Sequence, residues 1–264
     1  MSATQSAGTS SEDDGLRLVL PARTLPAGAG WEWITGGWKI FAQAPLMWII
    51  ALVIIVILAV LVNLVPIIGS IAFQLLQGVF AAGFVVACRS LEKGGNFELE
   101  HLFAGFRRNF GGLLLIGLLL LAGWIVVFLA FAGIVGFSLL GALLAGNGND
   151  MAAAILASGV SILLGLLVSL LLMVPLLAAY WFAPALVVMH GLAPLAAMKA
   201  SLAACWRNFM PFLVYGIIMT VFAVLATIPI GLGLLVWIPL AITSTYVAYR
   251  QIFTEEASTA MSPS

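Results

Sequence analysis

One stretch decides how this chain is organised: LAPLAAMKASLAACWRNFMP, residues 192–211. Arg207 and Asn208 point away from an apolar face in a helical projection of this stretch, and Lys199 lies at its flank. The stretch therefore predicts an amphipathic helix at the membrane surface that leads directly into a long apolar run. The apolar face, at helical spacing, consists of Leu195, Met198, Leu202, Cys205, Trp206 and Phe209.

Two other stretches repeat the pattern, residues 31–45 and residues 98–112, and long apolar runs follow both. We expect both to form similar surface helices, with apolar residues again gathered on one face. The expected faces are Trp31, Ile34, Trp38 and Phe41 in the first, and Leu99, Leu102, Phe103, Phe106 and Phe110 in the second.

Short motifs also recur between the units that these stretches begin. RNFGGL at 108–113 aligns with RNFMPF at 207–212, and ACR at 87–89 aligns with AYR at 248–250. Each unit would contain two spans, so successive units would share one orientation in the membrane. Any symmetry between them would run along the membrane normal, unlike the inverted repeats of many transporters.

Composition excludes a soluble fold. The chain has 264 residues, of which 64% are hydrophobic and 8% are charged, and its mean hydropathy is +1.21. Soluble domains carry roughly 25% charged residues, so lipid must be the solvent. The formal net charge is zero, which gives no basic field for a nucleic-acid partner.

We expect an all-α integral membrane protein with six transmembrane helices. They would form three hairpins, each preceded by an amphipathic cytoplasmic surface helix, in one domain over residues 27–253 between disordered tails at 1–26 and 254–264. The third and fourth apolar runs exceed the roughly 20 residues of one span, which predicts tilt or a break. The expected spans are 46–65, 67–88, 112–140, 152–189, 212–228 and 234–250.

The positive charges set the expected topology. All ten Lys and Arg residues fall in the N-terminal region, the second-to-third connection, the fourth-to-fifth connection or the C-terminal end. The positive-inside rule then places both termini in the cytoplasm of a bacterial inner membrane. Residues 1–30 lack the basic and apolar regions of a signal peptide.

Three small sets of residues are candidates for a role beyond spanning. Asn63, Gln74 and Gln77 are polar residues near or within the first two spans, and they predict either hydrogen bonds between helices or a polar cavity. We expect no Asp, Glu, Lys, Arg or His in the interior of any span, which argues against ion-coupled transport.

The fourth span carries small residues at strict four-residue spacing, which allows a neighbouring helix to approach closely. This packing stripe predicts either an intramolecular contact or the seam of a homodimer. Its candidate residues are Ala157, Ser161, Gly165 and Ser169.

Four basic residues at the ends of surface helices and spans either set topology alone or also contact anionic headgroups. These candidates are Arg107, Arg108, Lys199 and Arg207.

The sequence contains no constellation that predicts catalysis or a bound cofactor. Two histidines and two cysteines without close spacing do not make a metal site. No nucleophile elbow, P-loop or dinucleotide fingerprint is present. We therefore expect no enzyme, no metal and no cofactor.

Several motifs resemble an uncharacterised family of proteobacterial multi-pass inner-membrane proteins. They are GWKIFAQAPLMW at 37–48, VPIIG at 65–69, the run at 181–216 that begins WFAPALVVMH, and YVAYRQIF at 246–253. The resemblance covers roughly residues 27–253. The same sequence pattern is also distantly similar to the membrane domain of some glycerophosphodiester phosphodiesterases. It implies an inner-membrane location and a faint link to lipids. No catalytic residue is implied.

The function that the sequence favours is a non-enzymatic membrane-organising or lipid-associated component, with membrane lipid as its partner. A small-molecule transporter or channel is the alternative, and an accessory subunit of a membrane complex is a third. A homo-oligomer or a membrane-protein partner stays open. A transporter requires a continuous polar cavity, whereas a packed interior with lipid-facing grooves favours the first hypothesis.

We predict that a reporter fused after Asn149, active only outside the cytoplasm, will be active, because the connection there carries no Lys or Arg. The same reporter fused after Lys93 should be inactive. A cytoplasmic signal at Asn149 would contradict the six-span topology.

Overall fold

The computed structural model describes residues 16–145 and 151–256, without the side chains of residues 142–158 and 256. The described chain is helical apart from one pair of three-residue strands. The elements are β1 (Leu16–Leu18), α1 (Ala29–Phe41), α2 (Pro45–Asn63), α3 (Ile68–Glu92), η1 (Leu99–Phe103), α4 (Ala104–Arg107), α5 (Phe110–Ala145), α6 (Met151–Trp181), α7 (Ala183–His190), α8 (Pro194–Arg207), α9 (Phe209–Thr227), α10 (Leu234–Phe253) and β2 (Thr254–Glu256).

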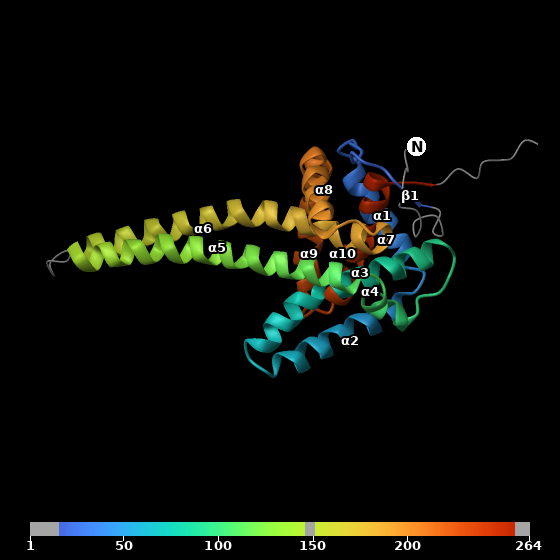
Figure 1. Ribbon diagram of the computed structural model, residues 1–264, viewed down its shortest axis with the longest axis horizontal. Helices are drawn as coiled ribbons and strands as arrows, with labels where there is room; N and C mark the ends of the chain where they lie inside the picture. The colour runs from blue at the N-terminus through green and yellow to red at the C-terminus, as the bar shows by residue number, and fades with distance from the viewer. Residues whose placement is uncertain (1–15, 146–150, 257–264) are drawn as a thin grey trace, which may run out of the picture.

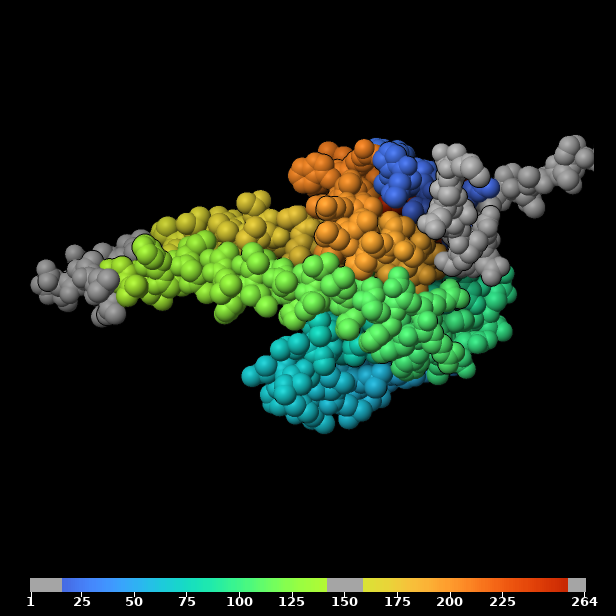
Figure 2. All heavy atoms as spheres, in the orientation of Figure 1, coloured from blue at the N-terminus to red at the C-terminus, as the bar shows by residue number. Residues whose placement is uncertain are grey.

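Two helical hairpins project from a common body in Figure 1, α2–α3 and the much longer α5–α6. Their large apolar side chains are exposed along most of their length. Figure 2 shows the two hairpins separated by an open notch in this view. Exposed Leu, Val, Ile and Phe on this scale require a hydrocarbon solvent.

Five segments in the described part of the chain are long and apolar enough to cross a membrane. They agree with the first five expected spans, and α6 and α7 together supply the fourth. The five segments are Pro45–Asn63, Ile68–Glu92, Phe110–Gly141, Gly159–His190 and Phe209–Thr227.

The expected sixth span, 234–250, is not among them. It forms helix α10, whose second half carries polar residues such as Thr243 and Ser244, both fully buried. Tyr246 and Tyr249 are buried as well. Much of α10 is therefore packed against other helices of the body, whereas we expected it to be surrounded by lipid.

The helices that precede the hairpins pack in a cyclic order. α8 packs on α6, and η1 and α4 pack on α3, so each contacts the second helix of the preceding hairpin. α1 packs on α10 and α9, which closes the circle between the first and the last unit. This order agrees with three repeated units in one orientation.

The faces that make these contacts agree only in part with the expected ones. Ile34 and Phe41 of α1 are buried as expected. In α1, Trp33 and Gly37 are buried, whereas the expected Trp31 and Trp38 are each 50% exposed. The buried Trp33 ring donates its Nε1–H to Gln251 Oε1 at 2.9 Å.

In α8, the small residues Ala197, Ser201 and Ala204 are buried. Ser201 Oγ donates to Ala178 O of α6 at 2.6 Å. Of the expected apolar face, Met198 is buried, whereas Leu202 and Cys205 are half-buried. Leu195, Trp206 and Phe209 are exposed, Trp206 at 79%. Small residues let two helices approach closely, whereas large apolar residues are stable against lipid. Helical spacing alone therefore missed the small residues that make the closest contacts.

The expected single helix at 98–112 is broken. The chain forms the 3-10 helix η1, then one turn of α4, and Asn109 adopts a positive φ of 54° before α5 begins. An asparagine tolerates this left-handed conformation better than most residues, and it turns the chain into the long hairpin.

Residues 16–26, which we expected in a disordered tail, are ordered. β1 pairs antiparallel with β2, so residues 254–256 of the expected C-terminal tail are ordered too. The fully buried Asn208 amide accepts from Leu25 N at 2.8 Å and donates to Arg23 O at 2.9 Å. Arg23 also pairs with Glu255.

We predict that Gly37→Ala lowers the free energy of unfolding by about 1–3 kcal/mol, the usual cost of overpacking. A Cβ at Gly37 would lie 2.6 Å from the backbone nitrogen of Ser244, so α1 would be forced away from α10. A thermal-unfolding measurement in detergent checks this. Gly216→Ala is the control, because a Cβ at Gly216 meets no atom within 4 Å; equal melting temperatures for both variants would contradict the packing.

Candidate functional site

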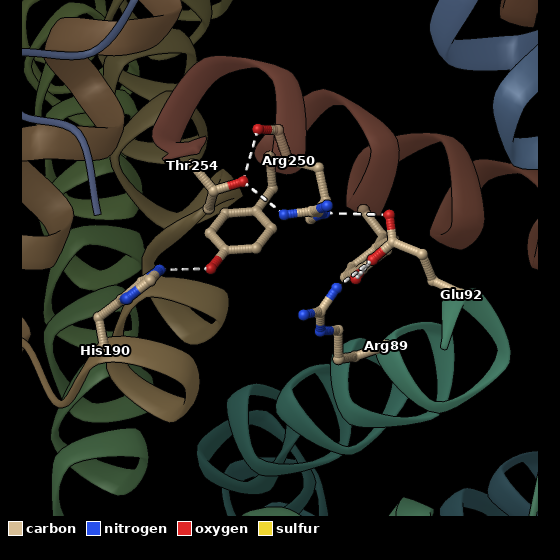
Figure 3. A network of polar contacts seen from close by, with 7 residues as sticks. Arg89, Glu92, His190, Arg250 and Thr254 are labelled. Carbon is tan, nitrogen blue, oxygen red and sulfur yellow. Dashed lines mark hydrogen bonds and ion pairs between the residues drawn. The ribbon is translucent and has the colours of Figure 1, made fainter. Parts of the chain in front are cut away.

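The ends of α3, α7 and α10 meet in a network of polar side chains (Figure 3). Its centre is the carboxylate of Glu92, which accepts from Tyr246 Oη at 2.5 Å. Arg89 Nη1 donates to the same carboxylate at 2.8 Å and Arg250 Nε at 3.0 Å. One acid thus joins the last turn of α3 to the last turns of α10.

A second branch of the network reaches α7. Tyr249 Oη lies 2.6 Å from His190 Nε2, and the Arg250 guanidinium donates to Thr254 Oγ1 at 2.9 Å. Arg89 and Arg250 belong to the repeated ACR and AYR motifs, so the matching ends of two units meet here.

The charges of this network depend on one another. The side chains of Arg89 and Arg250 are only 12% and 13% exposed, and Glu92 forms an ion pair with each of them. A guanidinium withdrawn from water is stable only when it is paired and hydrogen-bonded. Sequence analysis did not single out Glu92; its three-residue spacing from Arg89 on a helix was the available signal.

A mostly apolar cavity of about 400 Å³ lies beside this network. α2, α3, the α6–α7 segment and α10 all contribute to its wall. Tyr246 and Tyr249 belong to both structures, since their side chains line the cavity and their hydroxyl groups bond to Glu92 and His190. The two tyrosines therefore form the boundary between the apolar cavity and the charged network. Its aromatic lining includes Phe73, Phe80, Phe84, Tyr180, Trp181 and Phe182.

The structure divides the expected polar cluster of the first two spans. Asn63 is exposed and bonds to Ala59 O and Ser70 Oγ, at 2.8 Å and 2.7 Å, close to the α2–α3 turn. The buried Gln74 Nε2 has no hydrogen-bond partner in the described part of the chain. Gln77 lines the central cavity. No hydrogen bond from Asn63 to either glutamine is formed among the described residues.

The packing stripe of α6 faces α5. Ser161 is buried, and a Cβ on Gly165 would lie 3.0 Å from the Phe131 ring of α5. The Ser169 hydroxyl is buried and has no hydrogen-bond partner among the described residues. Ala157 lies in α6, but its side chain is outside the described part. Ser161 and Gly165 of the stripe therefore pack within the chain, which is the intramolecular alternative. The homodimer seam stays a prediction.

The four basic candidates are all exposed and lie where the second and third hairpins begin. Arg107 makes a 3.4 Å ion pair with Glu100, and Arg207 Nη1 lies 3.4 Å from Ala22 O. Arg108 and Lys199 make no ion pair with any described residue. All four side chains are therefore available to groups outside the protein.

The described residues hold no group of three or more His, Cys, Asp or Glu that could bind a metal. Burial raises the pKa of the Cys205 thiol to about 12, so it stays protonated and a poor nucleophile. Its Sγ lies 3.6 Å from Ala178 O, which indicates a packing role. The absence of enzymatic activity stays a prediction.

The chain is similar to a probable inner membrane protein of Burkholderia thailandensis. The two sequences are 29% identical over 245 residues, which cover 87% of this chain and 90% of that protein. No protein-family model and no solved structure matches the chain. With its apolar helices, this similarity identifies a multi-pass inner-membrane protein. The likeness to a phosphodiesterase membrane domain stays an expectation from the sequence.

We predict that Glu92→Gln lowers the free energy of unfolding by about 2 kcal/mol. The substitution removes the ion pairs that Glu92 makes with two mostly buried guanidinium groups, and partial exposure of Glu92 keeps the cost below that of a fully buried pair. Thermal unfolding in detergent measures the change.

Glu100→Gln is the matched control, because its pair with Arg107 is about three-quarters exposed on both sides and should contribute under 1 kcal/mol. If both variants unfold at the wild-type temperature, Glu92 does not hold the helix ends together.

Proposed function

We propose that this chain is a non-enzymatic, lipid-associated component of the inner membrane, which contacts anionic headgroups where its second and third hairpins begin. The observation that carries the proposal is that exposed basic side chains lie beside exposed aromatic side chains at both places. The proposed orientation puts these places at the cytoplasmic surface.

At the start of the second hairpin, three phenylalanines stack beside two arginines. The rings of Phe106 and Phe110 are stacked with centroids 5.5 Å apart, and Phe103 lies 6.2 Å from Phe106. All three are about 40% exposed, although they pack on one another. Arg107 and Arg108 lie within this segment and are exposed to the surroundings.

At the start of the third hairpin the same combination recurs. Trp206 and Phe209 are more than half exposed, and Arg207 lies between them in the sequence. Lys199 lies two turns earlier on α8 and is also exposed. Exposed aromatic side chains and basic side chains thus occur together in both units.

Charge alone would be enough to set topology, whereas the aromatic groups have a separate use. Aromatic side chains are favoured at the depth of the lipid headgroups and carbonyls, where an apolar ring can leave water while neighbouring polar groups stay wet. A cationic side chain at that depth gains about 1 kcal/mol from anionic lipid. The combination is typical of elements that lie in the membrane interface.

The interior supports lipid as the partner. Two of the described cavities have mostly apolar walls, and Gln77 is the one member of the expected polar cluster that lines either of them. A third, of about 520 Å³, has a mostly polar wall and lies beside Glu92 and Arg250 at the helix ends. A polar solute that crossed the bundle would need a continuous series of hydrogen-bonding groups.

We predict that the triple variant Arg107→Gln, Arg108→Gln, Arg207→Gln retains less anionic lipid than the wild type after purification in mild detergent. At about 1 kcal/mol for each charge, the affinity should fall by a factor on the order of 100. Native mass spectrometry of the protein with bound anionic phospholipid measures the loss.

Retention of a zwitterionic phospholipid should not change in the triple variant. Arg17→Gln removes an exposed arginine outside the proposed contacts, and it should leave retention of anionic lipid unchanged. If a correctly inserted triple variant retains as much anionic lipid as the wild type, these arginines set the membrane orientation only and the proposed headgroup contacts are wrong.

A further inference from the structure

We propose that the central cavity holds one hydrocarbon chain of a membrane phospholipid. This inference deepens the proposed lipid association, and it rests on different residues. The cavity is formed between the units, with α2 and α3 from the first, the α6–α7 segment from the second and α10 from the third. A bound chain would therefore contact all three.

The chemistry of the wall favours a hydrocarbon. Apolar and aromatic side chains cover most of it, from Phe80 and Phe84 on α3 to Ile238 and Ile242 on α10. A void of about 400 Å³ is well above the size at which an apolar cavity takes up an apolar ligand, and it falls within the range of ordinary ligand sites. In a membrane, the apolar ligand at highest concentration is the lipid chain.

The polar groups at the network end of the cavity are already used by the protein. Tyr246 Oη donates to the Glu92 carboxylate, and Tyr249 Oη bonds to His190. Their rings can therefore contact a ligand without requiring it to supply hydrogen bonds. A ligand without polar atoms can therefore occupy this part of the cavity without leaving the two tyrosine hydroxyl groups unbonded.

The wall of the cavity is continuous with surface that faces lipid. Ile55 of α2 lines the cavity, and the next two residues, Val56 and Ile57, are each 52% exposed. A chain could thus pass from the bilayer into the cavity along one helix, while its glycerol and phosphate groups stay outside.

Gln77 separates this proposal from its main rival. Its amide lines the cavity and makes no hydrogen bond with another described residue. A polar solute would use that amide, because an unmet donor and acceptor are costly in an apolar site. A hydrocarbon chain does not need it, so Gln77→Leu should preserve binding of the chain.

The test uses the full-length protein in nanodiscs of zwitterionic phospholipid, with a trace of the same phospholipid carrying a diazirine in one acyl chain. After irradiation, we expect labelled peptides from the cavity-lining parts of α3 and α10, and labelling should persist in Gln77→Leu. This experiment needs no variant to be interpreted. Labelling confined to exposed faces such as Val224 on α9 would overturn the proposal.

Two variants that fill the cavity from two different helices extend the test. Ala81→Phe on α3 and Ala241→Phe on α10 should each reduce cavity labelling at least fivefold. Ala122→Phe on α5 is the matched control, because Ala122 is exposed and does not line the cavity. Unchanged labelling in both filling variants, or loss of labelling in Gln77→Leu, contradicts the proposal. Preferential labelling of the cavity by a free diazirine fatty acid, with none by the phospholipid, also contradicts it.

The outcome is independent of the headgroup contacts proposed above. The nanodiscs contain no anionic lipid, so loss of Arg107, Arg108 and Arg207 should leave cavity labelling unchanged. Failure of the arginine variants to affect anionic-lipid retention, together with clear cavity labelling, would remove the headgroup contacts and keep the cavity site.

Discussion

The rest of this structure depends on the carboxylate of Glu92. It receives hydrogen bonds from two arginines and a tyrosine at 2.5–3.0 Å, and it joins helix ends that lie 158 residues apart in the sequence. Arg89 and Arg250 are almost removed from water, and their ion pairs with this acid offset part of the cost of burying them. The same bonds hold Tyr246 against the central cavity, so the network and the cavity wall form one unit.

Around this centre, small residues make the contacts between helices, and large apolar residues make the surface that faces lipid. Small residues such as Gly37 and Ser201 face neighbouring helices, where they allow close approach. Large apolar residues such as Trp206 face outward, where lipid solvates them. The exposed apolar surface of this protein is therefore enough to explain its contact with lipid. The basic residues beside the aromatic clusters add a preference for headgroup charge.

The differences from the sequence-based expectations have one origin. Helical periodicity shows that a face is apolar, but lipid and protein interior are both apolar, so periodicity cannot say which of them the face meets. Trp33 and Trp38 of α1 are alike in composition, yet one is buried against α9 and α10 and the other is half exposed. Likewise α10 was expected to cross the membrane, whereas Ser244 and Tyr249 place much of it within the body.

The sequence by itself determined the class of protein and the positions of the first five apolar segments, because composition and segment length are local properties. The spacing of small residues in α6 predicted a packing stripe. The aligned motifs ACR and AYR placed Arg89 and Arg250 at matching positions, each at the end of a repeated unit. Only the tertiary structure decided that Glu92 joins those ends, that Asn208 orders the segment around Arg23, and that Gln77 alone of its cluster lines the cavity. Each of these pairs residues far apart in the chain, and such pairings are set by the way whole helices pack.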